Sequence, residues 1–261
     1  MKPIKFQYIV RLQYLGFRYS GWQKQPGQRT IEAMLLKTLR FIRPGHVFKV
    51  LASGRTDAKV SALDAACCLF TGEAEIADLD AFTLLLNQNL PPDIRVLIIT
   101  KTSPDFNIIQ SVKEKQYVYL FSFGAKFHPF CAPFMANFLE DLDIDLMRES
   151  AKLFLGTHDF SAYTARLQKN AKTIRTITNC QITTNTLFTA NFFPEESFMF
   201  SVCGSGFMRY QIRMMMGALV QVGSGELNPE ELRQSLEPGS KVRLTYVAPG
   251  SGLSLNRLEF Q

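Results

Sequence analysis

The chain has 261 residues, of which 46% are apolar, so it is long enough for one large domain or two ordinary ones with a buried core. No run of eighteen apolar residues and no signal-peptide core occur, which disfavours a membrane protein and a secreted one. Five cysteines without a C-x-x-C pair and three widely spaced histidines disfavour a disulfide framework and a zinc site. They predict a reduced, cytoplasmic setting.

Positive charge is concentrated at the beginning of the chain. Residues 1–60 hold twelve Lys/Arg and two Asp/Glu, whereas the rest of the chain holds seventeen and twenty-one. Such an imbalance predicts a polyanionic partner, most simply a nucleic acid. A solvated basic surface without special purpose explains the charge equally well.

The first hundred residues predict six elements. Alternating apolar residues over 6–14 indicate a half-buried strand, and a loop over 16–29 follows. Thr30 is a suitable N-cap for a helix whose apolar stripe includes Ile31, Leu35 and Leu39. We further expect strands over 47–52, 65–70 and 94–100, and a helix over 78–87.

The remaining residues predict a similar order of elements. We expect strands over 117–123, 175–183, 198–204 and 253–260, and helices over 144–155, 207–222 and 229–236. The sequence therefore predicts an α+β fold with two similar subdomains, residues 1–104 and 105–261. Each has a largely antiparallel sheet with helices on one face.

One segment, Ser53 to Ala62, places the carboxylate of Asp57 two residues after Arg55. Nearby cations favour the ionised form of a carboxylate, so we expect Asp57 to be charged. An ionised carboxylate beside an arginine can act as a nucleophile or as half of a structural ion pair. The residues alone leave both readings open.

Two further places suggest recognition of an anion or a base. The mostly apolar helix predicted at 207–222 carries Arg209 and Arg213 on one face, and such arginines need a carboxylate or phosphate partner unless they reach solvent by snorkelling. Tyr117 and Tyr119 share one face of a strand and could stack a base, although two half-buried sheet aromatics are as plausible.

The segment over 166–175 has four cations and no acid, and it could be a second patch that contacts phosphates. Over 16–25, basic residues interleave with aromatic and amide side chains. This mixture suits looped RNA, although a solvated loop remains an equal alternative. The candidate RNA-contacting residues are Arg18, Trp22, Lys24, Arg29, Lys59, Arg166, Lys169 and Lys172.

Several catalytic motifs are missing from the sequence. It contains no P-loop, no G-x-G-x-x-G, no G-x-S-x-G and no H-x-E, so nucleotide cofactors, serine hydrolysis and zinc deamination lose support. His158-Asp159 is interpreted as shaping a turn. We expect neither a cofactor nor a metal.

Six ordered motifs make the chain resemble the TruA family of tRNA pseudouridine synthases along nearly its whole length. They are Gly21-Trp22-Gln23 with Gln25-Pro26 and Arg29-Thr30; Gly54 to Ala58; Lys115 to Tyr119; Gly156 to Phe160; Gly206 to Met208 with Arg213 and Gly217; and Ala248 to Leu253. Each motif is weak alone, but six in the right order are specific.

The resemblance implies two α+β halves around an active-site cleft, usually in a homodimer that binds tRNA and needs no cofactor or metal. It implies that Asp57 is the nucleophile, that Arg55 and Arg213 hold its charge, and that Tyr117 packs on the target base. The implied substrates are uridines of the tRNA anticodon arm, typically at tRNA positions 38, 39 and 40. The sequence departs from the family where Lys59-Val60-Ser61 replaces the common Gly-Val-His.

Two other functions share some of these features. A catalytically weak or inactive RNA-binding protein or tRNA chaperone of the same fold would keep the basic loops. A glycosidase or base-excision enzyme would share the lone carboxylate, but the lack of an obvious carboxylate pair argues against ordinary glycoside hydrolysis.

Overall fold

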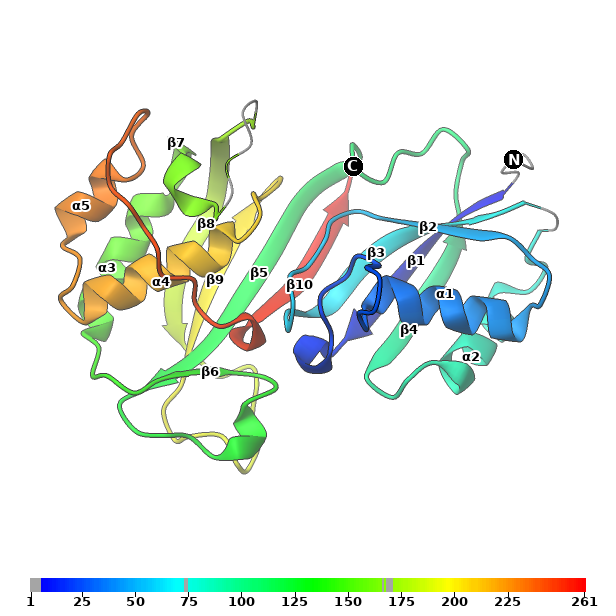
Figure 1. Cartoon of the computed structure of the whole chain (residues 1–261), viewed down its shortest axis with the longest axis horizontal. Helices are drawn as coiled ribbons and strands as arrows, with labels where there is room; N and C mark the ends of the chain where they lie inside the picture. The colour runs from blue at the N-terminus through cyan, green and yellow to red at the C-terminus, as the bar shows by residue number, and fades with distance from the viewer. Residues whose placement is uncertain (1–5, 73–74, 166, 168–170) are drawn as a thin grey trace. The chain divides into compact units, whose positions relative to one another are not determined.

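The computed structural model describes residues 6–72, 75–165, 167 and 171–261. Within these residues the chain forms ten β-strands and five α-helices, an α+β arrangement with mostly antiparallel strand pairs. It packs into two compact units (Figure 1). The first holds residues up to Lys113 together with Leu255–Gln261, and the second holds Glu114–Ser254.

The first unit contains β1 (Phe6–Tyr14), β2 (Phe48–Ala52), β3 (Ser61–Thr71), β4 (Ile94–Lys101) and β10 (Leu253–Phe260). Its strands lie in the order β4-β1-β3-β10, and β2 also pairs with β3. Strand β1 runs antiparallel to both β3 and β4. The alternation predicted for 6–14 is confirmed, since Tyr8, Val10 and Leu12 are fully buried while their neighbours are more exposed.

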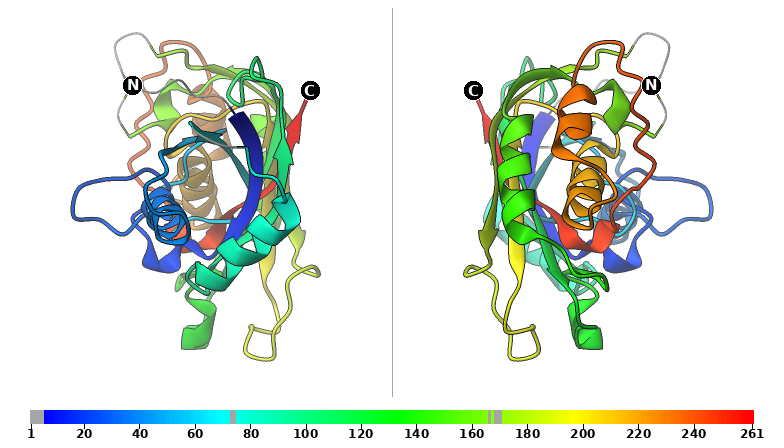
Figure 2. Two further views of the ribbon diagram at one scale, coloured as in Figure 1. Left: turned by 90° about the vertical axis from the view of Figure 1, so that its right-hand side faces the viewer. Right: turned by 90° about the vertical axis from the view of Figure 1, so that its left-hand side faces the viewer.

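Two helices complete the first unit, α1 (Ile31–Ile42) and α2 (Leu79–Asn89), which lie next to each other on the sheet (Figure 2, left). Thr30 caps α1 as predicted, because its hydroxyl accepts a hydrogen bond from the backbone N–H of Ala33. Asp78 caps α2 in the same way. Ala66, Cys68, Ile108 and Leu258 form a cluster of buried apolar side chains.

The second unit contains β5 (Val112–Phe123), β6 (Ala136–Phe138), β7 (Gly156–Asp159), β8 (Ile174–Thr184) and β9 (Phe198–Gly204). Its strands lie in the order β5-β9-β8-β7, and β6 runs parallel to β5. The helices are α3 (Ile144–Ala151), α4 (Gln211–Gly223) and α5 (Pro229–Gln234) (Figure 2, right). Gly223 allows α3 and α4 to approach closely, since a Cβ there would lie 2.7 Å from the sulfur of Met147.

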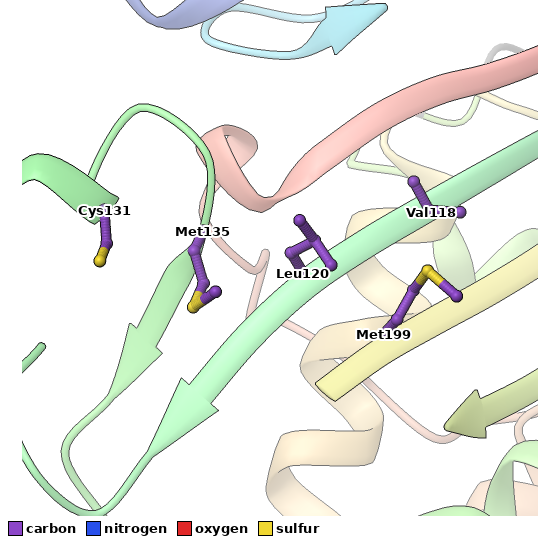
Figure 3. Close-up of a cluster of buried hydrophobic side chains, with 5 residues drawn as sticks. All are labelled: Val118, Leu120, Cys131, Met135 and Met199. Atoms are coloured by element: carbon purple, nitrogen blue, oxygen red, sulfur yellow. The ribbon is translucent and has the colours of Figure 1, made fainter. Parts of the chain in front are cut away.

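Successive side chains of strand β5 point to opposite faces of the sheet. Val118 and Leu120 pack with Met199 of β9 and with Cys131 and Met135 of the 127–138 connection, as Figure 3 shows. Tyr117 and Tyr119, one residue out of phase, therefore face the opposite side of the sheet. This places both tyrosines on one face, as the sequence predicted.

The predicted helix over 207–222 differs from the structure at its beginning. Helix α4 begins at Gln211, because Tyr210 has left-handed backbone with φ 65° and ψ 0°. Residues 207–209 therefore lie outside the helix. The sequence also did not indicate the short strands β6 and β7.

Candidate active site

Asp57 lies in the connection between β2 and β3. The two strands are antiparallel, and Ser53 begins the connection with both its N–H and its hydroxyl donating to the carbonyl of Ala66 at 3.0 Å. Near its end the N–H of Val60 donates to the carbonyl of Asp57 at 3.2 Å. The turn that this bond closes contains Lys59, whose φ of 67° is left-handed.

The loop after β1 holds the Asp57 connection by backbone hydrogen bonds. The N–H of Trp22 donates to the carbonyl of Thr56 at 3.0 Å, and the N–H of Lys59 donates to the carbonyl of Tyr19 at 3.0 Å. These two bonds lie on either side of Asp57 in the sequence. They fix the backbone of Asp57 by peptide groups, which substitutions of nearby side chains leave in place.

Side chains add two more anchors, one directly before Asp57 and one at the first residue of β3. The hydroxyls of Tyr14 and Thr56 lie 2.9 Å apart, and the hydroxyl of Ser61 accepts a hydrogen bond from the N–H of Gly16 at 2.9 Å. Ser61 is thus a buried structural residue.

Two glycines make this close approach possible. A Cβ on Gly16 would lie 2.0 Å from the carbonyl oxygen of Val60, and a Cβ on Gly21 would lie 2.6 Å from that of Thr56. Gly21 also has a φ of 94°. Any larger residue would therefore displace the Asp57 connection.

The side chain of Asp57 is partly exposed, whereas that of Arg55 is exposed. The ammonium of Lys59 lies 5.6 Å from the centre of the Phe17 ring, within the range of a cation–π contact. The first unit thus presents a carboxylate and two cations on one short loop. Such a loop can hold an ionised carboxylate next to a polyanion.

Arg18 and Arg29 form a network with Asp93 in the first unit. Arg18 donates to Asp93 through Nε at 3.1 Å and Nη2 at 2.8 Å, and the hydroxyl of Tyr19 donates to Asp93 at 2.5 Å. Arg29 stacks 4.8 Å from the Tyr19 ring. The network ties the segment of Tyr19, whose carbonyl holds Lys59, to the beginning of β4.

The pKa values of this network reflect its geometry. Burial, helped by the hydrogen bond to Asp93, raises the pKa of Tyr19 to about 12. Burial alone would raise the pKa of Asp93, but the hydrogen bonds from Tyr19 and Arg18 and the charge of Arg18 outweigh it and lower that pKa. Asp93 is therefore a charged anchor.

The other candidate RNA-contacting residues differ in exposure. Trp22 is buried, and its ring centre lies 6.0 Å from that of Tyr14, so its indole supports the loop from inside. Lys24 and Lys172 are exposed. Arg166 and Lys169 lie outside the residues that the structure describes.

Tyr117, in the second unit, lies in β5 opposite Val202 of β9. Its ring meets that of Phe207 edge to face, with ring centres 5.4 Å apart and planes at 86°. Phe207 is available for this contact because it lies outside α4. The edge-to-face contact holds the ring of Tyr117 at a fixed tilt.

Arg213 lies in the first turn of α4 and is held by the segment around Ala248. Its Nε donates to the carbonyl of Ala248 at 2.7 Å, and the N–H of Ala248 donates to the carbonyl of Arg213 at 3.1 Å. Its Cζ also lies 5.2 Å from the ring centre of Tyr210. The orientation of this guanidinium is therefore fixed by several neighbours.

The segment that holds Arg213 is itself fixed on two sides. A Cβ on Gly217 of α4 would lie 2.3 Å from the carbonyl oxygen of Tyr246, so a glycine is needed where this segment crosses the helix. The hydroxyl of Tyr119 donates to the carbonyl of Pro249 at 2.8 Å, and burial raises the pKa of that hydroxyl. The Ala248–Leu253 motif is thus a support for Arg213.

Of the predicted catalytic residues, Asp57 and Arg55 belong to the first unit, and Tyr117 and Arg213 to the second. The sequence did not single out Tyr210 as part of the site, and it gave no role to Phe207 or Ser61 beyond their places in the motifs. Glycines at 16 and 217 were the available signal of close backbone approach, but a left-handed tyrosine has no sequence signature.

The turn predicted at His158-Asp159 is wrong, because both residues lie in strand β7. The Nε2 of His158 lies 2.7 Å from the carbonyl oxygen of Leu155. The described residues contain no group of three or more His, Cys, Asp or Glu that could hold a metal ion. Within the same ranges, no helix has the length and apolarity to cross a membrane. The five cysteines are all buried and free.

Comparison with known proteins finds similarity over nearly the whole chain. A family model described as "tRNA pseudouridine synthase" matches residues 150–261. A protein of Thermodesulfovibrio yellowstonii named "tRNA pseudouridine synthase A" is 32% identical over 251 residues, which cover 95% of this chain and 97% of the relative.

Two further relatives carry the same name. That of Pelobacter propionicus is 33% identical and covers 98% of both chains. That of Shouchella clausii is 32% identical and covers 96% of this chain and 92% of its own.

Proposed function

This chain belongs to the TruA family of tRNA pseudouridine synthases, which are isomerases, and we propose that it converts uridines of the tRNA anticodon arm to pseudouridine with Asp57 as the nucleophile. One observation carries the proposal for Asp57. Backbone hydrogen bonds from Trp22 and Lys59 hold the connection on both sides of this residue. A nucleophile needs such a fixed position relative to its substrate.

The reaction conserves all atoms. The bond between N1 of uracil and C1′ of ribose breaks, uracil turns, and a bond between C5 and C1′ forms, while C5 loses a proton and N1 gains one. The carboxylate of Asp57 assists by attacking either C1′ of the ribose or C6 of the uracil, and it is released unchanged. No oxidant, reductant or water is consumed.

The remaining site residues have separate tasks in this proposal. Arg55 and Arg213 keep Asp57 ionised through their positive charge. Tyr117 packs on the target base, which must leave its stack to react. The fixed orientations of Arg213 and Tyr117 within the second unit support these assignments.

Cations of the first unit bind the tRNA backbone in the same proposal. Lys24, Arg29 and Lys59 are exposed and contact phosphates, and Arg18 contributes while it anchors to Asp93. Lys172, Arg166 and Lys169 form a second basic segment. Trp22 supports this surface from the interior.

We also propose a homodimer in the cytoplasm, as is usual for the family. The five free, buried cysteines agree with a reducing compartment. Sedimentation of the purified protein measures the dimer, and a monomer at all concentrations would contradict it.

Replacement of Asp57 by Asn tests the nucleophile, since it keeps the shape of the side chain and removes its charge. We expect pseudouridine formation in an anticodon-arm transcript to fall by at least about a thousand-fold, with tRNA affinity retained. Asp105→Asn, at an exposed carboxylate of the same unit, is the control and should keep the full rate. A normal rate for Asp57→Asn would show that the nucleophile is another residue.

The same assay separates the two alternative functions. Tight, salt-sensitive tRNA binding by the parent protein with no isomerised uridine would indicate an RNA chaperone. Release of free uracil would indicate a base-excising enzyme. A pseudouridine map of cellular tRNA with and without the protein then identifies the modified positions.

A further inference from the structure

Tyr210 has a backbone conformation that tyrosine rarely adopts. Within the described chain it shares left-handed φ among non-glycine residues only with Lys59. It stands immediately before α4, and its own side chain does not cap the helix. Such conformations cost free energy and persist where surrounding contacts enforce them, often at functional sites.

The bend at Tyr210 redirects the chain that precedes α4. The N–H of Met208 donates to the side-chain oxygen of Gln211 at 2.8 Å, and the N–H of Gln211 donates to the carbonyl of Met208 at 3.1 Å. These reciprocal bonds close the turn around Tyr210. Phe207 consequently leaves the helical path and packs edge to face on Tyr117.

The ring of Tyr210 contacts two guanidinium groups. The Cζ of Arg213 lies 5.2 Å from the ring centre and that of Arg209 lies 4.8 Å from it. Arg209 also donates to the hydroxyl of Tyr210 at 3.1 Å. Both distances are in the range of cation–π attraction, which is stronger for the less exposed Arg213.

We propose that Tyr210 is a positioning residue for isomerisation in this chain. Its backbone brings Phe207 to Tyr117, and its ring orients the guanidinium of Arg213. The inference rests on the proposed function, in which Tyr117 and Arg213 act on the target base and on Asp57. Tyr210 acts through these two residues and has no contact with substrate in the proposal.

Three variants separate the ring from the backbone. Tyr210→Phe keeps the ring and loses only the hydroxyl, so we expect a kcat within about twofold of the parent. Tyr210→Asn accepts left-handed backbone but has no ring, and we expect kcat to fall roughly tenfold with KM and Tm little changed. Tyr210→Gly, which adopts the conformation without strain, should behave like the Asn variant and remain folded.

Arg148→Ala is the matched control, because Arg148 stacks on Phe198 at 5.7 Å in the same unit. Its kcat should equal that of the parent. A parent-like kcat in both Tyr210→Asn and Tyr210→Gly would overturn the inference. Equal losses in Tyr210→Phe and Tyr210→Asn would also overturn it, since the hydroxyl and not the ring would then be responsible.

Arg213→Gln distinguishes a failure of this inference from a failure of the proposed function. If Arg213→Gln keeps the full rate, the proposed role of Arg213 is wrong. If Arg213→Gln is inactive while Tyr210→Asn is fully active, only the inference about Tyr210 is wrong. In an Arg213→Lys background, the change to Asn at 210 should cost less than in the parent, because the two residues act together.

Discussion

Lys59 combines a strained backbone with an exposed positive charge. Left-handed backbone suits glycine, yet a lysine stands here, two residues after Asp57. Its N–H is committed to the carbonyl of Tyr19, which enforces the conformation. Lysine at this position therefore lowers stability but places a cation beside the proposed nucleophile.

Paired variants at Lys59 measure this strain. Both Lys59→Ala and Lys59→Gly remove the charge, but only glycine fits the left-handed backbone without cost. We expect the Gly variant to be the more stable of the two by about 1 kcal/mol, the reverse of the usual order. Urea unfolding measures the difference, and an Ala variant of equal or higher stability would exclude strain at this position.

Asp93 makes the stability of the first unit depend on pH in the acid range. Its folded pKa is lowered, so its contribution to stability is fully present above the ordinary value of 3.8 and is lost as pH falls through the lower folded value. We expect Asp93→Asn to reduce the unfolding free energy at neutral pH and to flatten its decline below about pH 4. Unfolding curves between pH 2 and 7 test this, and an unchanged acid limb would contradict it.

Many of the individual residues that shape the candidate site could not be predicted from the sequence. The six motifs identified Asp57, Arg55, Tyr117 and Arg213 as candidates through resemblance. Trp22 and Tyr19 hold the Asp57 connection through their peptide groups, and any amino acid supplies those groups. A pattern of side chains therefore could not reveal them.

Elements with strong local signals were predicted well. Helix α1 has a capping threonine and an apolar stripe, and strands β1 and β9 match their predicted bounds. The beginning of α4 was wrong, because Phe207 and Met208 continue the helical apolar pattern across a left-handed residue. Strands β6 and β7 have three and four residues, too few for a recognisable alternation.

Gly217 tests the contact between α4 and the segment that supports Arg213. Alanine in place of a helical glycine usually stabilises by about 1 kcal/mol, but here the new Cβ would meet the Tyr246 carbonyl at 2.3 Å. We expect Gly217→Ala to destabilise by about 1–3 kcal/mol and to reduce kcat, because Ala248 moves away from Arg213.

Gly206→Ala is the control for this change, since a Cβ at Gly206 meets nothing within 4 Å. Thermal unfolding and single-turnover rates of both variants provide the comparison. A Gly217→Ala protein with higher Tm and full rate would show that the Tyr246 segment yields easily.

At the scale of the whole molecule, the first unit holds most of the excess positive charge and also takes in the last residues of the chain. The sequence placed the excess positive charge within residues 1–60, and these residues belong to the first unit. The sequence could not indicate that residues 255–261 also pack there. Strand β10 pairs with β3, nearly two hundred residues away, and nothing local encodes such a partner.

Salt dependence tests whether this charge binds RNA. We expect the logarithm of tRNA affinity to fall linearly with the logarithm of salt concentration, and Lys24→Gln and Lys59→Gln each to reduce the slope by about 1. Lys113→Gln, at an exposed lysine near Glu259, is the control and should leave the slope unchanged. Equal slopes for all variants would remove Lys24 and Lys59 from the interface.

The return of β10 to the first unit has a consequence for synthesis. A ribosome makes β1 to β4 early, but their sheet receives β10 only after all of the second unit has emerged. Folding of the second unit in the meantime makes the intervening segment compact, and a shorter effective loop lowers the entropy lost when β10 docks. Folding of the second unit thereby favours completion of the sheet in the first unit. Strand β3 lacks β10 as a partner until residues 253–260 have been made.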